Sequence, residues 1–265
     1  MPPSRLISPA DLPGDPLRFL SERLDACRDR IARAAARAGR SARDVRLVAV
    51  TKYVDAGVIG LLYGLGLRDF GESRVQALAV KRQELVALGR SHLAVNPQGL
   101  VALPDAQFHL LGHLQRNKVR RALESCAVIQ SVDSLRLLEE IERQAESSTG
   151  SLPDLYIEVN VSGEEQKTGL PERELTSLLE EASRRPAIAP MIRGLMGMAP
   201  AVSDPQEARP SFRRLRELRD AARRAELLPP DADLSMGMTD DFEAAIEEGA
   251  GTVRIGRLLY GEAMG

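Results

Sequence analysis

One lysine stands where a buried strand is expected to end. Residues 47–52 read Leu-Val-Ala-Val-Thr-Lys, so four apolar residues run directly into a hydroxyl and an amine. A continuous apolar run of this length is typical of a strand buried on both faces of a parallel sheet. If Lys52 is buried at the carboxyl end of such a strand, its uncharged amine is favoured and becomes a nucleophile toward carbonyl groups. The alternative is a solvated lysine that begins a loop.

A second group of residues suited to chemistry lies near the other end of the chain. Residues 235–238 read Ser-Met-Gly-Met, and residues 254–257 read Arg-Ile-Gly-Arg. Glycines allow backbone amides to approach phosphate oxygens, and a serine hydroxyl adds a donor. Taken singly, Gly237 and Gly256 are better explained as turn glycines. A phosphate site close to a reactive lysine would indicate a phosphorylated carbonyl ligand, and pyridoxal 5′-phosphate (PLP) is the obvious candidate.

Strand and helix patterns alternate along the chain and would have to bring these two groups together. Short apolar runs predict strands over residues 47–52, 69–72, 108–112, 127–132, 155–161, 192–198, 234–238 and 252–256. Helical patterns cover residues 16–40, 55–64, 75–88, 114–123, 133–146, 172–184, 205–227 and 240–248. Residues 91–106 are polar and contain proline and glycine, so we expect a surface loop there.

Eight strand–helix units result if the first helix is paired with the last strand. Such alternation without a break in composition implies parallel βα units, and eight of them imply a closed barrel. We therefore predict an α/β fold with a single (β/α)8 TIM barrel over residues 17–265, after a disordered or loosely attached tail over residues 1–16. The alternative, an open doubly wound sheet, would have fewer strands and a glycine fingerprint where Lys52 and Tyr53 stand.

Active sites of such barrels lie at the carboxyl ends of the strands, and phosphate sites follow strands seven and eight. The polar residues expected at this end are Lys52, Glu72, Ser73, His113, Gln115, Asn117, Ser131, Asp133, Asn160, Ser235 and Arg254. No carboxylate–histidine set typical of a metal site is evident among them, and no Ser–His–Asp order is evident either. We expect no metal.

Composition narrows the class of protein further. The chain has 265 residues and a net charge of −2, so no global field attracts nucleic acid or an anionic membrane. No apolar run of about 20 residues predicts a membrane span, and the proline-containing start has no apolar signal core. Cys27 and Cys126 fit reduced, buried thiols of a cytoplasmic protein, with a disulfide between them as the alternative.

The motifs also occur in the order of a known family. The matching stretches are residues 47–52, 68–72, 109–118, 129–133, 159–160, 193–196, 234–238 and 253–256. On these stretches the chain resembles the pyridoxal-phosphate homeostasis proteins, which are single-domain relatives of the N-terminal barrel of alanine racemase. The resemblance spans roughly residues 20–262, and it implies the same barrel and PLP as the cofactor.

The resemblance assigns roles to individual residues. It implies that Lys52 forms an internal Schiff base with PLP and that Arg254 faces the pyridine nitrogen. The phosphate would be held by Ser235 and by the backbone at Gly256 and Arg257. A cation beside the pyridine nitrogen disfavours its protonation, and an unprotonated ring is a weaker electron sink. We therefore expect a site that holds the cofactor without catalytic residues that promote carbanion chemistry.

Two further residues, Asn160 and Met236, would line the cofactor by the same resemblance. The chain departs from the family pattern at Ser73, where asparagine is usual, and at Gln107, where an aromatic residue is usual. These departures concern contacts near the cofactor mouth and not the assignment of Lys52.

The resemblance implies a protein that holds PLP reversibly, buffering or delivering it with little or no turnover. PLP-dependent apo-enzymes are the partners that this role suggests, and barrels of this kind support both a monomer and a homodimer. The alternative is a PLP-dependent amino-acid racemase that is weakly active or completed by a partner, because racemisation needs a second base on the opposite face of the cofactor. His113 could serve as a base, whereas Tyr260 is a poor substitute.

Several candidate residues also have simpler explanations. Arg254 could form a salt bridge with an acid such as Glu262, and His113 could be a hydrogen-bonding residue at a helix start. The basic run over residues 116–121 fits a solvated helix face better than a nucleic-acid site. The four methionines between residues 196 and 238 fit barrel filling better than a binding stripe.

Overall fold

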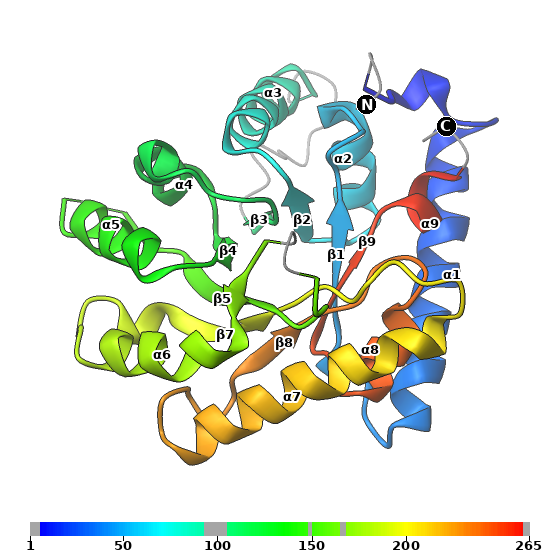
Figure 1. Cartoon of the computed structure of the whole chain (residues 1–265). Coiled ribbons are helices and arrows are strands. Elements are labelled where there is room, and N and C mark those ends of the chain that lie inside the picture. The colour runs from blue at the N-terminus through cyan, green and yellow to red at the C-terminus, as the bar shows by residue number, and fades with distance from the viewer. Residues whose placement is uncertain (1–5, 93–104, 148–149, 165–167, 262–265) are drawn as a thin grey trace.

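The computed structural model describes residues 6–92, 105–147, 150–164 and 168–261 of the chain. At its centre eight parallel strands form a closed barrel (Figure 1). The barrel strands are β1 (Arg46–Val50), β2 (Asp69–Glu72), β3 (Gln107–Leu110), β4 (Val128–Val132), β5 (Asp154–Asn160), β7 (Ile192–Met196), β8 (Asp233–Ser235) and β9 (Thr252–Ile255). β1 pairs with both β2 and β9, and β4 pairs with β5, which closes the ring. The predicted (β/α)8 TIM barrel is confirmed.

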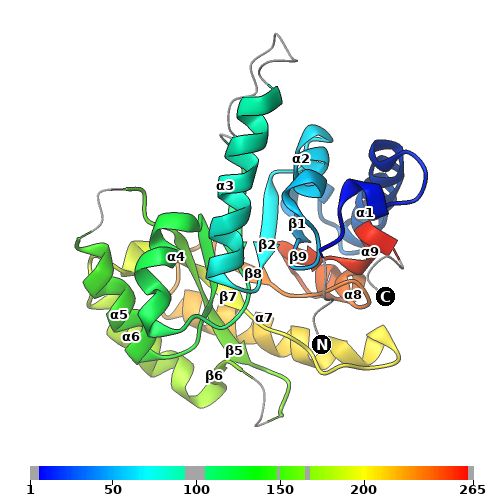
Figure 2. The same cartoon turned by 90° about the horizontal axis from the view of Figure 1, so that it is seen from above.

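Helices cover the outside of this barrel. They are α1 (Pro16–Arg37), α2 (Ala56–Gly64), α3 (Val75–His92), α4 (Val119–Ser125), α5 (Leu135–Ala145), α6 (Leu175–Ser183), α7 (Arg209–Arg224), α8 (Phe242–Glu247) and α9 (Arg257–Tyr260). A short strand that was not expected, β6 (Leu170–Pro171), pairs with β5 outside the ring. α3 extends beyond the end of the barrel (Figure 2). Most of the expected surface loop over residues 91–106 lies outside the described residues.

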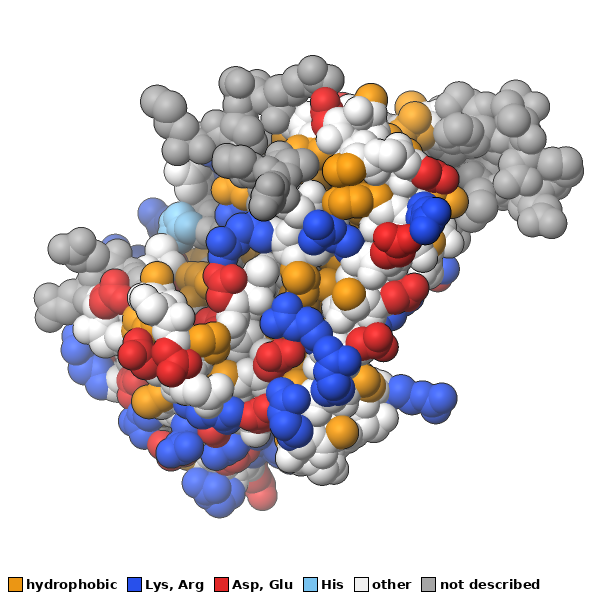
Figure 3. All heavy atoms as spheres, turned by 90° about the vertical axis from the view of Figure 1, so that its right-hand side faces the viewer, with side chains coloured by type: hydrophobic (Ala, Val, Ile, Leu, Met, Phe, Trp, Pro, Cys, Tyr) orange, Lys and Arg blue, Asp and Glu red, His pale blue; other side chains and the backbone are white. Residues whose placement is uncertain are grey.

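α1 completes the eighth strand–helix unit from the opposite end of the sequence. The carboxylate of Asp15 caps its first turn. Its apolar stripe is buried and consists of Leu20, Leu24, Cys27, Ile31, Ala34 and Ala35. The helix packs against α8 and α9, and Arg30 forms an ion pair with Glu243 of α8 at 3.0 Å. Basic and acidic side chains intermingle over this face of the molecule (Figure 3).

Part of the N-terminal segment is packed on the barrel. Ile7 and Leu12 are buried in the apolar core. The backbone N–H of Ile7 donates to the carbonyl of Tyr53 at 2.8 Å, and the N–H of Asp55 donates to the carbonyl of Ile7 at 2.9 Å. Residues 6–12 are therefore attached more firmly than we expected for a tail over residues 1–16. The first five residues lie outside the described part of the chain.

Four strands end two or three residues earlier than their apolar runs suggested. β1 ends at Val50, β3 at Leu110, β7 at Met196 and β8 at Ser235. Gly237 has a φ of +92°, a left-handed conformation that ends β8 and begins the loop to α8. Both cysteines are buried and free. In the described part of the chain no helix has the length and apolar character needed to cross a membrane.

Candidate functional site

The barrel brings the carboxyl ends of its strands to one mouth, as the sequence predicted. Lys52 follows β1, Asn160 ends β5, and Ser235 ends β8. Arg254 lies in β9, and its register partner on β1 is Val48. The same register sets Gly256 beside Val50, since a Cβ atom at Gly256 would lie 3.4 Å from the Cβ of Val50. The chain leading to Lys52 and the glycine of the second motif are thus neighbours.

The side chain of Lys52 is exposed, which agrees with the alternative of a solvated lysine that begins a loop and not with a buried amine. Its Nζ lies 4.8 Å from the ring centroid of Tyr53. Among the described residues the amine makes no hydrogen bond or ion pair. β1 ends at Val50, and the turn over residues 51–53 carries Lys52 out of the packed barrel wall.

A second lysine is buried beneath this turn. Lys81 of α3 forms an ion pair with Glu72 at the end of β2, and the two side chains are 3% and 1% exposed. The Lys81 amine also donates to the carbonyl oxygen of Thr51 at 2.7 Å. The hydroxyl of Thr51 donates to Glu72 at 2.9 Å. Two of these contacts hold Thr51, the residue that directly precedes Lys52, and the ion pair joins their two partners.

Sequence reasoning missed Lys81, although a signal was present. Lys81 continues the apolar stripe of α3 that contains Val75, Leu78 and Leu85, at three- and four-residue steps. A lysine on the buried face of a helix either reaches solvent with its amine or is paired with a buried acid. Glu72, at the preceding strand end, is that acid.

Arg254 is buried, with 5% exposure, and faces the barrel mouth from β9. Its Nη1 donates to the hydroxyl of Ser235 at 2.7 Å, and its Nη2 donates to the carbonyl of Gly197 at 3.0 Å. Burial lowers the pKa of Arg254 to about 10, an effect that the nearby carboxylates of Asp241 and Glu158 oppose. The guanidinium is therefore charged at neutral pH. Glu262, the acid considered as its alternative partner, lies outside the described residues.

Ser235 lies at the predicted strand end, and its hydroxyl already has partners inside the barrel. Its side chain is fully buried, and its hydroxyl donates to the side-chain oxygen of Gln130 at 2.6 Å while accepting from Arg254. A serine hydroxyl has a single O–H donor, and a phosphate oxygen would need that same donor. In this structure Ser235 therefore holds Arg254, and its predicted contact with a phosphate stays a prediction.

The turn from β9 into α9 offers backbone donors at the mouth. The N–H of Gly256 donates to the hydroxyl oxygen of Thr239 at 3.4 Å, and sequence reasoning did not include Thr239. In the described part of the chain the N–H groups of Arg257 and Leu258 donate to no other group, as is usual in the first turn of a helix. The Arg257 side chain forms an exposed ion pair with Asp240.

Asn160 and Met236 hold local structure in addition to any role toward a ligand. The Asn160 side-chain oxygen accepts from the N–H and the hydroxyl of Ser162 at 3.2 and 2.9 Å. Its amide donates to the carbonyl of Glu164 at 2.9 Å, so Asn160 shapes the loop after β5. Met236 is fully buried in the apolar core, in line with barrel filling.

Titratable groups also surround the mouth. Glu158 is buried, and burial raises its pKa even though the hydroxyl of Thr168 donates to it at 2.7 Å. His113 is exposed, and its Nδ1 lies 3.0 Å from a carboxylate oxygen of Asp133. This contact agrees with the simpler explanation of His113 as a hydrogen-bonding residue. The arginines over residues 116–121 are exposed, as expected of a solvated face.

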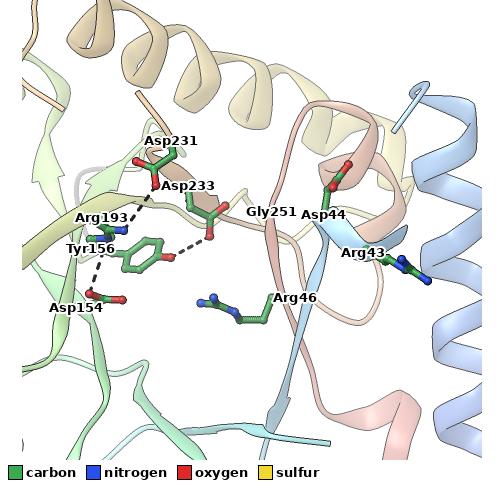
Figure 4. Close-up of a pocket in the computed structure, with 9 residues that line it drawn as sticks. All are labelled: Arg43, Asp44, Arg46, Asp154, Tyr156, Arg193, Asp231, Asp233 and Gly251. Carbon is green, nitrogen blue, oxygen red and sulfur yellow. Dashed lines mark hydrogen bonds and ion pairs between the residues drawn. The ribbon is translucent and has the colours of Figure 1, made fainter. Parts of the chain in front are cut away.

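A separate pocket of about 330 Å³ lies at the opposite, amino-terminal end of the strands (Figure 4). Basic and acidic side chains both line it. Arg193 lies 3.9 Å from Asp154 and 3.6 Å from Asp231, and the hydroxyl of Tyr156 donates to Asp233 at 2.9 Å. Since this end of a TIM barrel serves stability and not catalysis, we place the candidate site at the other mouth.

Comparison with known structures first defines the class of barrel. Alanine racemase from Corynebacterium glutamicum superimposes with a TM-score of 0.61 over 92% of this chain and 60% of that chain, at 12% sequence identity, which shows a shared fold. PipY of Synechococcus elongatus, whose structure was solved with PLP bound, superimposes with a TM-score of 0.74 at 33% identity. It covers 91% of this chain and 100% of that chain.

Sequence comparison then gives the family. The pyridoxal phosphate homeostasis protein of Aquifex aeolicus is 39% identical over 241 residues, which are 91% of this chain and 97% of that protein. The human protein of the same name is 34% identical over 247 residues, or 90% of this chain and 85% of that protein. No protein-family model matches the chain. This chain belongs to the family of pyridoxal phosphate homeostasis proteins.

Proposed function

We propose that this protein binds PLP at the carboxyl-terminal mouth of its barrel and takes part in PLP homeostasis. The observation that carries the proposal is the pairing of β1 with β9. It sets the buried cation Arg254 and the backbone donors at Gly256 beside the strand that leads to Lys52. Membership of the family and the likeness to PipY, which binds PLP, support the same site.

The turn after β9 suits a phosphate. Gly256 has a negative φ of −124°, and an added Cβ would meet nothing closer than 3.4 Å, so the folded chain alone does not require glycine there. Close approach of a ligand to the backbone explains the absent side chain. We expect the N–H groups of Arg257 and Leu258 to donate to the phosphate oxygens, and the N–H of Gly256 to exchange its long 3.4 Å bond to Thr239 for a phosphate oxygen.

Arg254 suits the ring of the cofactor. Its guanidinium has five N–H donors, and the contacts with Ser235 and Gly197 leave donors for a ligand. A permanent cation disfavours a proton on the facing ring nitrogen. PLP supplies an aldehyde that condenses reversibly with an amine and a ring that withdraws electrons. Arg254 would weaken the electron withdrawal by the ring and leave the reaction of the aldehyde with an amine intact. This combination suits a protein that holds and releases PLP.

Lys52 is the amine that the proposal assigns to covalent attachment. Its side chain is exposed and long, so it can reorient on a fast timescale without disturbing the barrel. Asn160, in the loop after β5, is proposed to line the cofactor. The proposal extends to a cytoplasmic location and to PLP-dependent apo-enzymes as recipients, with a monomer or a homodimer as the working form.

An absorption titration with PLP tests this function. Wild-type protein should develop a visible chromophore that borohydride reduces, and Lys52→Ala should not. Lys118→Ala is the matched control, because Lys118 follows β3 at the same end of the barrel and should leave the chromophore unchanged. A wild-type protein without a reducible chromophore at saturating PLP would contradict the proposal.

A further inference from the structure

Five polar side chains from five strands form one continuous line of hydrogen bonds through the barrel. Arg254 of β9 donates to Ser235 of β8, which donates to Gln130 of β4 at 2.6 Å. Gln130 contacts His109 of β3 at 3.0 Å, and His109 contacts Asp69 of β2 at 2.9 Å. The middle three residues are fully buried. A polar line of this length inside an aliphatic barrel is costly unless every group is satisfied.

Each link of this line has one consistent direction. The ionised carboxylate of Asp69 can only accept, so the Nε2–H of His109 donates to it. The Nδ1 of neutral His109 then accepts from the Gln130 amide, which turns the Gln130 oxygen toward the Ser235 hydroxyl. Ser235 donates to that oxygen and keeps its lone pairs for Arg254. Burial lowers the pKa of His109, which agrees with the neutral form that this direction requires.

Arg254 depends on this line because its direct acceptors are neutral. Within the described part of the chain its guanidinium forms no ion pair, and the carboxylates of Asp241 and Glu158 act on it only from a distance. Its charge is held by the Ser235 hydroxyl and one carbonyl oxygen. A hydroxyl rotates freely unless its proton forms a hydrogen bond, and here the Ser235 proton is bonded to Gln130. Without that bond the buried Arg254 would have a weaker and less oriented acceptor.

We infer that Gln130 and His109 are positioning residues for Arg254, holding its guanidinium at the ring of the cofactor although neither is proposed to touch the cofactor. This inference rests on the proposed function for its consequence, the binding of PLP. Its structural part, the fixed orientation of Arg254, stands on the hydrogen bonds alone.

Isosteric variants in β4 test the inference. Gln130→Met removes both links of residue 130 while keeping its volume, so it should weaken PLP binding about tenfold and shift the absorption maximum of the bound chromophore. Ser131→Ala is the matched control, since it removes a buried 2.8 Å hydrogen bond from the same strand without touching the line. Equal affinity and equal spectra for Gln130→Met and wild type would overturn the inference.

A second pair of variants guards against a folding defect at residue 130. His109→Gln can still accept from Gln130 and donate to Asp69, so PLP affinity should be retained. His109→Leu can do neither, so PLP affinity should fall. Equal affinities for His109→Gln and His109→Leu would overturn the inference.

An experiment on the protein without PLP tests this inference separately from the proposed function. Side-chain ¹⁵N NMR of Arg254 should show a slowly exchanging guanidinium in wild type and in Ser131→Ala, and averaged signals in Gln130→Met. Unchanged Arg254 signals in Gln130→Met would overturn the positioning role. A wild-type protein with these NMR signatures that fails to bind PLP would instead contradict only the proposed function.

Discussion

At the scale of single residues, the chemistry at the barrel mouth depends on what each side chain is bonded to. The sequence indicated that Lys52, Ser235 and Arg254 share one end of a barrel, because each follows or ends an apolar run. It could not indicate that the Ser235 hydroxyl is directed at Gln130, 105 residues away in the chain. It also left open whether the Lys52 amine is buried or solvated, since a strand pattern does not show whether the residue after the strand is exposed.

The charge of Arg254 is the first property to test. Arg254→Met removes the cation that is proposed to face the ring nitrogen, so PLP affinity should fall by about tenfold or more, and the bound chromophore should respond to pH as the ring nitrogen gains a proton. A spectroscopic titration measures both. Arg120→Ala, on the exposed face of α4, is the control. Wild-type affinity and spectra in Arg254→Met would contradict the assignment.

The buried His109 predicts how stability depends on pH. Asp69, Arg46 and Asp154 face this imidazole, and burial holds its folded pKa below the ordinary value near 6.5. The unfolded chain therefore binds the proton more readily, and the folded state loses stability as the pH falls through about 6.5 toward the lower folded pKa.

Denaturation at pH 8, 6 and 5 measures this effect. The free energy of unfolding should fall less steeply below pH 6.5 in His109→Gln than in wild type. His113→Gln, with an exposed ring, should keep the wild-type slope. Identical slopes for wild type and His109→Gln would show that His109 does not titrate as described.

At the scale of elements, α3 and β2 are joined by a buried ion pair. Lys81→Met alone leaves Glu72 buried without its partner and should destabilise the fold by about 3–5 kcal/mol. The double variant Lys81→Met/Glu72→Leu removes both charges and should recover most of that loss. Denaturant unfolding distinguishes the cases. A single variant as stable as wild type would mean that the ion pair does not hold the turn before Lys52.

Two glycines at the mouth should respond to substitution in opposite ways. Gly237 has a positive φ, and an added Cβ would lie 2.6 Å from the Cβ of Ala245, so Gly237→Ala should lower stability by roughly 1–3 kcal/mol. Gly256 has a negative φ and room for a Cβ. Gly256→Ala should therefore fold like wild type but bind PLP more weakly, which thermal unfolding and a PLP titration together measure. Full PLP affinity in Gly256→Ala would argue against a phosphate at this turn.

At the scale of the whole molecule, the alternation of apolar runs and helical patterns was enough to predict a closed barrel. Strand order follows from short right-handed βα connections, so little else was needed. The packing of residues 6–12 was not predicted, because it depends on contacts with residues 53–55, far along the chain. The short β6 was not predicted either, because its two residues are too few to show a strand pattern. The polar line through the barrel was not predicted either, because its residues come from five strands that are far apart in the sequence.

The burial of Tyr260 in the fold affects whether the protein can racemise amino acids. Tyr260, the residue weighed as a second base, is fully buried, and burial raises the pKa of its hydroxyl. We therefore expect racemisation of alanine and other amino acids to stay at background when PLP-loaded protein is assayed at high concentration. Robust turnover that depends on His113 would support the racemase alternative instead.

The residue to which PLP becomes attached can be identified directly. The chain has four lysines, Lys52, Lys81, Lys118 and Lys167, so borohydride reduction of PLP-loaded protein followed by peptide mass spectrometry can identify the modified residue without ambiguity. We expect a single stoichiometric adduct on Lys52. An adduct chiefly on another lysine, or spread evenly among the accessible lysines, would contradict it.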